Sequence, residues 1–125
     1  MATWNSNVEL TPFIASADLS AKQFTFVALD AAGKVASPAA GAFADGVVFN
    51  NPKSGEPASV ALTPGKVLKV KCGGNIAAGA EIATDANGAA ITATTSGHIK
   101  VGKALEAGVS GRVIEIAFGY RGAVA

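Results

Sequence analysis

Side chains able to carry out chemistry are few in this sequence of 125 residues. His98 is the single histidine and Cys72 the single cysteine, so a nucleophilic system would have to be built on His98, and no Gly-x-Ser-x-Gly elbow accompanies it. This pair gives no zinc spacing, and Asp85, Asn87 and Gly88 form only a fragment of a calcium-type loop. We therefore predict no catalytic residue and no metal site, a structural or solvent-exposed His98, a buried Cys72 and a simple turn at Asp85.

Glycines and lysines supply the other candidate sites. The Gly73-Gly74 pair lacks both the phosphate-cradling Gly-x-x-x-x-Gly-Lys-Ser/Thr loop and the Gly-x-Gly-x-x-Gly order of a dinucleotide site, so it predicts a turn and no cofactor. A basic patch could form from lysines on two segments, namely Lys66, Lys69, Lys71, Lys100 and Lys103. No aromatic residues that would stack on bases lie beside them, which favours a solvated sheet face. If the patch has a partner, an acidic protein surface fits it better than DNA.

Composition limits the partners that the chain can attract. Ten basic and nine acidic residues give a formal net charge of +1, so no strong field gathers nucleic acid or an anionic membrane surface. Charged residues make up only 15% of the chain and apolar residues 50%, which favours burial of some surface against a protein partner. Neither a signal peptide nor an apolar run of about 18 residues is present. We expect an intracellularly made, soluble protein without direct nucleic-acid or membrane contact.

Short β-prone segments, separated by turns rich in Gly, Pro and Asn, make up most of the chain. We expect strands over residues 22–29, 34–36, 42–49, 58–62, 66–72, 81–84, 89–93, 98–105 and 112–118. In the strand at 66–72, alternation places Leu68, Val70 and Cys72 in the core. No segment predicts a long amphipathic helix. The pattern predicts an all-β fold, a small antiparallel β-barrel or sandwich of about eight short strands with an extended N-terminal arm.

The N-terminal segment, residues 1–21, shows no sustained period of either strand or helix. It contains Trp4, Phe13 and Ile14 among Asn, Ser, Thr and Pro residues. Aromatic residues without a local pattern for burying them are typical of an arm that a neighbouring molecule orders, and a strand packed on the chain's own barrel is the alternative. The predicted organisation is an arm (1–21), a β-barrel domain (22–118) and a C-terminal tail (119–125).

The C-terminal half carries motifs that resemble a known family. Residues 76–118 contain a turn of the type AAGAEIATDANG, the segment GHIKVGKALEAG and a closing strand GRVIEIAF. This ending, together with the residues from 56 onward, resembles the capsid cement, or head decoration, proteins of tailed bacteriophages. The resemblance implies a non-enzymatic virion protein, without cofactor, that binds the outer surface of the expanded phage head. There it would stabilise capsomer contacts against internal DNA pressure, after synthesis in the host cytoplasm.

The resemblance also implies partners, namely the major capsid protein and neighbouring copies of the chain, often as a homotrimer. Aromatic residues dominate interface hot spots, so we expect Trp4, Phe13 and Ile14 to anchor on a neighbour. Tyr120 and Arg121, in the tail after the last strand, are the second candidate interface, with a frayed terminus as the alternative.

Two other function classes stay open. A virion or surface module that recognises a glycan or receptor would carry aromatic and polar residues at its loop tips, whereas the clearest tip, NNPKSGEP at 50–57, has no aromatic residue. A group-carrier domain would present a modified lysine in a tight turn, as Lys103 superficially does. The Asp-Lys-Ala or Met-Lys-Met triplet of such carriers is missing around it.

Overall fold

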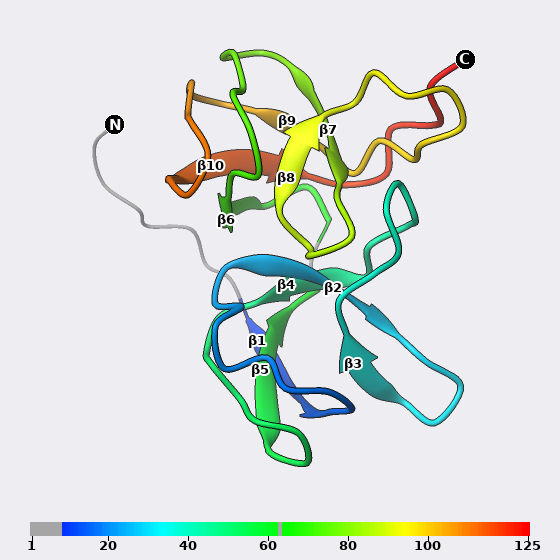
Figure 1. Cartoon of the computed structure of the whole chain (residues 1–125), viewed down its shortest axis with the longest axis vertical. Helices are drawn as coiled ribbons and strands as arrows, with labels where there is room; N and C mark the ends of the chain where they lie inside the picture. The colour runs from blue at the N-terminus through cyan, green and yellow to red at the C-terminus, as the bar shows by residue number, and fades with distance from the viewer. Residues whose placement is uncertain (1–8, 63) are drawn as a thin grey trace.

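Ten short strands form two five-stranded sheets in the computed structural model, which describes residues 9–62 and 64–125 (Figure 1). The strands are β1 (Leu10–Ala15), β2 (Thr25–Leu29), β3 (Lys34–Ala36), β4 (Gly46–Val48), β5 (Pro57–Ala61), β6 (Val67–Lys71), β7 (Glu81–Thr84), β8 (Ala90–Thr92), β9 (Gly102–Ala104) and β10 (Val113–Phe118). The prediction of an all-β fold is confirmed. We refer to residues 9–62 as the barrel lobe and to residues 64–125 as the sheet lobe.

The barrel lobe is a closed barrel with the strand order β1-β3-β2-β4-β5. Its pairs are antiparallel except for β1 and β3, which run parallel through Ile14 and Ala15. On its other side β1 pairs with β5, from Leu10 opposite Ala61 to Ile14 opposite Pro57. Because β1 has partners on both sides, it closes the barrel and removes a sheet edge that would otherwise be free to aggregate.

The position of β1 corrects the predicted arm over residues 1–21. Leu10–Ala15 is a strand of the chain's own barrel, and Leu19, which follows it, is buried in the barrel interior. The strand period was hidden because β1 is apolar on both faces: Phe13 and Ala15 pack inward, whereas Ile14 lies exposed. Trp4 lies outside the described residues, so the expectation for it stays a prediction.

The sheet lobe has the strand order β6-β10-β9-β7-β8, with every pair antiparallel. Its two outer strands approach each other, because Cys72, next to β6, forms a parallel bridge with Ala90 of β8. The sheet is therefore rolled around its own apolar side. Leu68, Val70 and Cys72 are buried in this interior, as their alternation predicts.

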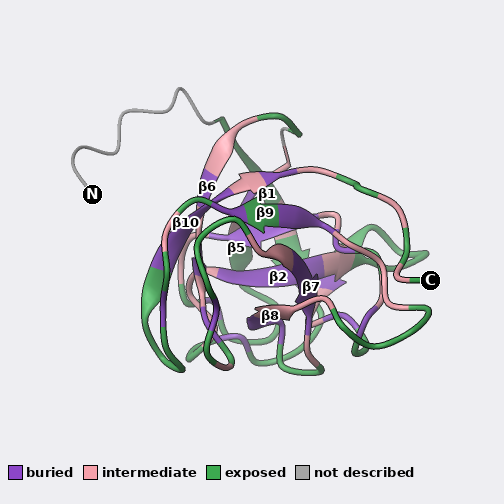
Figure 2. Cartoon of the chain, turned by 90° about the horizontal axis from the view of Figure 1, so that it is seen from above, coloured by how far each residue is buried: buried purple, intermediate pink, exposed green. Residues whose placement is uncertain are grey.

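Two cores result, and the strands of the barrel contribute to both. Val27, Val48 and Val60 fill the barrel interior, whereas their neighbours along the strands point toward the sheet lobe. The largest of these neighbours is Phe26, which is fully buried and stacks on Phe118 of β10 with ring centroids 6.3 Å apart. Figure 2 shows the buried strands gathered in the middle of the molecule, under exposed loops.

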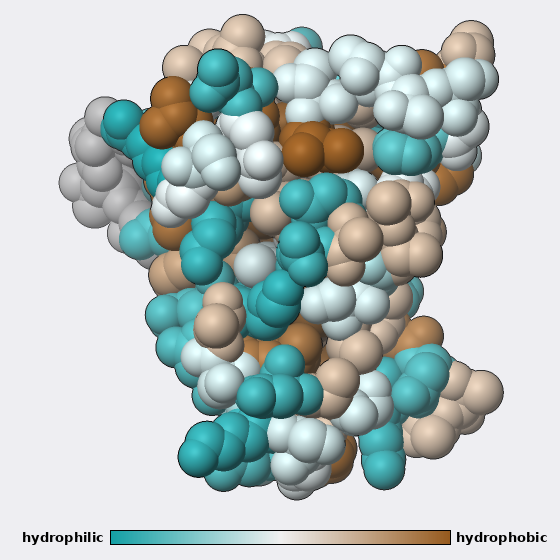
Figure 3. Space-filling model, viewed as in Figure 1, coloured by the Kyte–Doolittle hydropathy of each residue, from teal (hydrophilic) through white to brown (hydrophobic). Residues whose placement is uncertain are grey.

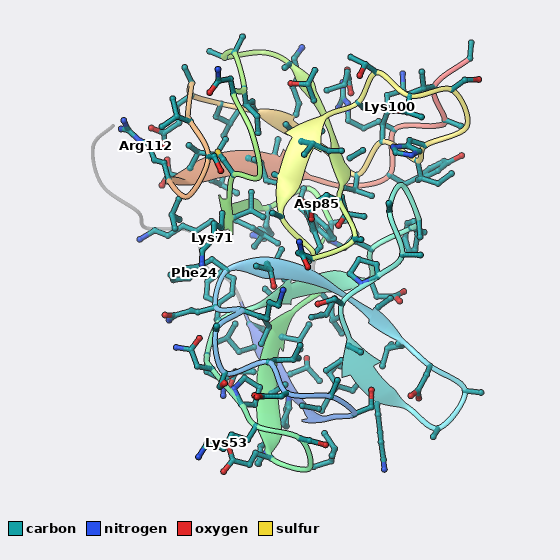
Figure 4. The ribbon with its side chains drawn as sticks, in the orientation of Figure 1. Phe24, Lys53, Lys71, Asp85, Lys100 and Arg112 are labelled. Atoms are coloured by element: carbon teal, nitrogen blue, oxygen red, sulfur yellow. The ribbon has the colours of Figure 1, made fainter. Side chains whose placement is uncertain are left out.

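Backbone hydrogen bonds join the two lobes directly. The N–H of Lys71, at the end of β6, donates to the carbonyl of Phe24 at 2.7 Å, and these two residues lie beside each other in Figure 4. Phe24 holds a φ of 63°, which is rare for a bulky residue, and it is stabilised by this bond and by an edge contact with Phe49. The N–H of Phe26 likewise donates to the carbonyl of Gly88 at 2.7 Å. The lobes are thus fixed to each other by main-chain atoms.

Candidate interaction surfaces

The turn at Asp85 uses its carboxylate to bind its own backbone. One carboxylate oxygen, Oδ1, accepts hydrogen bonds from the N–H groups of Asn87 at 2.8 Å and Ala89 at 2.9 Å. An aspartate that folds its own turn in this way has that oxygen already occupied. Within residues 9–62 and 64–125, no group of three or more His, Cys, Asp or Glu side chains is placed to hold a metal ion.

Cys72 and His98 are both packed against glycines. Burial raises the pKa of the Cys72 thiol, so the reactive thiolate is disfavoured, and a Cβ on Gly108 would lie 2.8 Å from its sulfur. The His98 ring covers Gly41, where a Cβ would lie 2.1 Å from the ring atom Cδ2. The Nδ1 atom of His98 is buried without a hydrogen-bond partner in the described chain. Cys72 therefore fills space in the core of the sheet lobe, and His98 packs against the loop at Gly41.

Exposed apolar side chains occur in small groups, and Figure 3 shows apolar and polar residues interspersed on the visible face. The large hydrophobic residues with more than a third of their surface exposed are Leu10, Ile14, Leu29, Phe43, Leu105, Val109, Val113 and Tyr120. Single exposed apolar residues are common on soluble proteins, so the informative cases are those that lie together.

One such group lies on the outer face of the barrel and follows β1. Leu10, Pro12 and Ile14 alternate along that face and are exposed, and Pro57 is exposed opposite Ile14 on β5. Pro12 lacks a backbone N–H, which is tolerated because β1 pairs only with β5 at that position. We call these four residues the β1 stripe.

The structure separates the two hydrophobic residues predicted to act together in β1. Phe13 is partly buried against the barrel core, whereas Ile14 is 40% exposed on the outer face. Phe13 thus helps to hold β1 in the barrel, and Ile14 is available to a partner. Leu10, Pro12 and Pro57 were not recognised from the sequence, although the period-2 spacing of Leu10, Pro12 and Ile14 was a signal for one strand face.

The C-terminal tail pairs with a loop of its own chain. The N–H of Arg121 donates to the carbonyl of Lys100 and the N–H of Lys100 to that of Gly122, while Ile99 and Ala123 form an antiparallel bridge. The tail is therefore not frayed, and an interface at Tyr120 and Arg121 stays a prediction. Tyr120 remains 65% exposed, and Arg121 bonds to the sheet lobe.

An ion pair holds the tail to β7. The Nε atom of Arg121 donates to a carboxylate oxygen of Glu81 at 2.6 Å, and this hydrogen bond lowers the pKa of the Glu81 carboxyl below its ordinary value. Lys100 and Lys103 lie close enough to lower it further. Because both members of the pair are partly exposed, water screens the attraction and its contribution to global stability is small.

Removing this pair should loosen the tail without unfolding the protein. In Glu81→Gln, we expect protection of the Arg121 and Lys100 amides from hydrogen exchange to fall several-fold. In the folded wild type, the pKa of the Glu81 carboxyl lies below its ordinary value of 4.5. The ion pair is therefore complete above pH 4.5, and it is lost as the pH falls through the pKa of the folded state. The control is Glu106→Gln, because the Glu106 carboxylate accepts a hydrogen bond from the Glu115 N–H and not from the tail. This variant should leave the protection of the tail amides unchanged. Equal protection in both variants would contradict a role for the pair.

Phe43 and Tyr120 form an exposed aromatic pair that the sequence did not reveal. Their ring centroids lie 6.2 Å apart with the planes at 58°, and Phe43 is 48% exposed. The sequence placed Phe43 on a strand over 42–49, but β4 is shorter and Phe43 lies in the preceding loop. That loop, residues 37–45, rises from the barrel toward the sheet lobe (Figure 1). Gly41 anchors it by donating to Thr84 and accepting from Ile99.

The five lysines considered as a basic patch do not form one surface. Lys69 lies opposite Glu115 in the β6–β10 register, and Lys103 lies opposite Glu81 in the β9–β7 register. Lys71 and Lys100 are on different sides of the sheet lobe (Figure 4). The five lysines therefore do not form a continuous basic patch, because acidic residues lie opposite two of them and others lie far apart.

Within the described residues, no helix has the length and apolar character needed to cross a membrane.

Comparison with known proteins gives one family and a set of solved structures. The family described as phage cement protein matches residues 11–119. Comparison with curated proteins finds no match. Among solved structures, the head fiber gp8.5 N base of bacteriophage phi29 shares the fold, with a TM-score of 0.77 and 17% sequence identity over 93% of this chain and 97% of that one. Since the family match extends from within β1 to the end of β10, the chain belongs to the phage cement proteins, structural proteins of the phage head.

Proposed function

We propose that the chain decorates the exterior of the expanded phage head and stabilises contacts between capsomers against internal DNA pressure. Its partners would be the major capsid protein and neighbouring copies of itself, as a homotrimer at symmetry axes. It would act through binding energy alone and not through catalysis. Binding repeated over a symmetric shell makes modest individual contacts sufficient, because simultaneous engagement raises the effective affinity.

The observation that carries this proposal is the β1 stripe on a member of the cement family. Leu10 and Ile14 are 46% and 40% exposed on a strand that is paired on both sides, so the apolar face is held in place before a partner arrives. Preorganisation of this kind reduces the entropy lost on binding. Residues 1–8, which contain Trp4, precede the stripe in the sequence, and Trp4 is proposed as a separate anchor.

The test is co-sedimentation with expanded phage heads that lack the protein, scored for saturation and for resistance of the heads to heat. We expect the wild type to saturate at a symmetry-related copy number, and the double variant Leu10→Thr, Ile14→Thr to bind about tenfold more weakly. Threonine keeps the strand propensity while removing apolar area. The matched control is Leu105→Thr, Val113→Thr, which removes equally exposed apolar residues (50% and 37%) from the sheet lobe and should bind normally.

A deletion of residues 1–8 tests Trp4 separately and ends before β1, so it leaves the barrel complete. A deletion through residue 21 would instead remove β1 and unfold the barrel. If the wild type fails to bind expanded heads, decoration is the wrong function. Should the wild type bind while both the stripe variant and the deletion bind as well as it does, decoration stands and the assigned surface is wrong.

A further inference from the structure

The aromatic pair Phe43–Tyr120 lies on a supported part of the surface, not on a loose end. The loop that carries Phe43 is tied to the sheet lobe through both backbone groups of Gly41, at 2.8 Å to the Thr84 carbonyl and 2.8 Å to the Ile99 amide. The tail that carries Tyr120 is tied by its ladder to residues 97–100 and by the Arg121–Glu81 pair. Two segments far apart in sequence are therefore fixed so that they present two aromatic rings together.

Two exposed aromatic rings side by side are unusual for this chain, because it has only six Phe, one Tyr and one Trp. Phe26 and Phe118 are buried, and Phe13 and Phe49 are partly buried against a core. Phe43 and Tyr120 instead keep 48% and 65% of their surface exposed. Rigid aromatic side chains lose little entropy on binding and dominate binding hot spots, so a pair held in this way has the properties of a partner anchor.

The charges beside the pair indicate the chemistry of the partner. Within residues 9–62 and 64–125, the one ion pair closer than 4.0 Å joins Arg121 to Glu81. Lys100 and Lys103 lie near the same carboxylate, so three basic side chains share one acidic side chain and the local charge is positive. Lys100 belongs to the segment that pairs with the tail. The sheet lobe as a whole carries seven basic and four acidic residues. An approaching segment would find complementarity if it were acidic.

We propose that Phe43, Tyr120, Lys100 and Lys103 form a second interaction surface that binds an acidic protein segment carrying an apolar or aromatic anchor. The anchor packs against the two rings, and carboxylates approach the two lysines. This surface shares no residue with the β1 stripe and does not depend on decoration of the head. With both surfaces occupied, one molecule connects two protein neighbours.

NMR titration of the ¹⁵N-labelled full chain tests the proposal, with a short peptide of one central tryptophan flanked by glutamates as the probe. We expect shifts confined to the amides around Phe43, residues 97–101 and residues 120–122. The double variant Phe43→Ala, Tyr120→Ala should bind about tenfold more weakly. Lys100→Gln, Lys103→Gln and added salt should weaken binding severalfold. The control Leu105→Ala, Val109→Ala, which removes other exposed apolar residues, should bind as the wild type does.

Three outcomes would overturn the inference. The first is no shift at this surface, and the second is equal binding of a lysine-flanked peptide, which would remove the acidic specificity. The third is a response to oligosaccharides, titrated in parallel, in place of the acidic peptide, which would assign the aromatic pair to glycan recognition. The measurement uses no phage heads, so its result is independent of whether the decoration function holds.

Discussion

Gly88→Ala is expected to lower the free energy of unfolding by about 3 kcal/mol. Gly88 has a φ of +79°, where an L-residue loses about 1–2 kcal/mol. A Cβ there would also lie 2.5 Å from the carbonyl oxygen of Phe26 and 3.2 Å from the Cβ of Thr25. Overpacking of this kind costs about 1–3 kcal/mol more, because backbone atoms cannot move aside as a side-chain end can. Urea denaturation of the two proteins gives the difference.

Gly33→Ala is the matched control. Gly33 has nearly the same φ, +77°, but an added Cβ would meet nothing within 4 Å. It should therefore show the backbone cost alone, about 1–2 kcal/mol. The difference between the two variants measures the close approach between the Asp85 turn and β2. Equal losses would mean that the lobes separate locally to admit the methyl group, and that their contact is not rigid.

The close approach of Gly88 to β2 explains why the fold needs the turn at Asp85–Gly88. The Asp85 carboxylate shapes the turn, Gly88 permits the left-handed conformation, and the Gly88 carbonyl then receives the Phe26 N–H. The sequence alone suggested a turn and raised calcium as an alternative. The turn joins the sheet lobe to the barrel through the hydrogen bond from Phe26 to Gly88. The sequence alone does not show this role, because Phe26 is far from Gly88 in the chain.

Local patterns were sufficient to place several of the strands. The strand predicted over 66–72 appears as β6 with Leu68 and Val70 inward, and the strands at 34–36 and 81–84 have the predicted bounds. Residues 112–118 likewise contain β10 with Ile114 and Ile116 buried. Apolar and polar residues alternate clearly in β6, where a period of 2 identifies both the strand and its buried side. The other segments were identifiable because β-prone residues stand between turn signals.

The same reasoning failed where a segment is apolar on both faces or is held from a distance. The sequence of β1 resembles an arm because Leu10 and Ile14, on its exposed face, are as apolar as Phe13 on its inner face. Phe43 was placed on a strand face, but the loop around it is held by bonds from Gly41 to the other lobe. The position of the tail at Tyr120 was not visible either, because the segment that pairs with it, residues 97–100, is a loop far from it in the sequence. Both candidate surfaces therefore depend on long-range pairing that no local pattern records.

Phe26→Ala should lower the free energy of unfolding by more than Gly88→Ala does. Phe26 is fully buried and contributes from β2 to the core of the sheet lobe, where it stacks on Phe118. Truncation of such a side chain leaves a cavity and costs about 3–5 kcal/mol, which is a large part of the roughly 5–15 kcal/mol that stabilises a typical domain. Phe43→Ala makes the same chemical change at a residue that is 48% exposed and should cost well under about 1 kcal/mol.

The shape of the unfolding transition then decides whether the two lobes form one cooperative unit. β2 sends Phe26 into one core and Val27 into the other, so damage to either core should reach both through a single strand. We expect one transition by circular dichroism and by tyrosine fluorescence in the wild type and in Phe26→Leu, which keeps most of the volume and remains folded. If the barrel instead survives after the sheet lobe has melted, β2 does not couple the cores. The Phe43–Tyr120 surface, which takes one ring from each lobe, would then be lost while the β1 stripe remains.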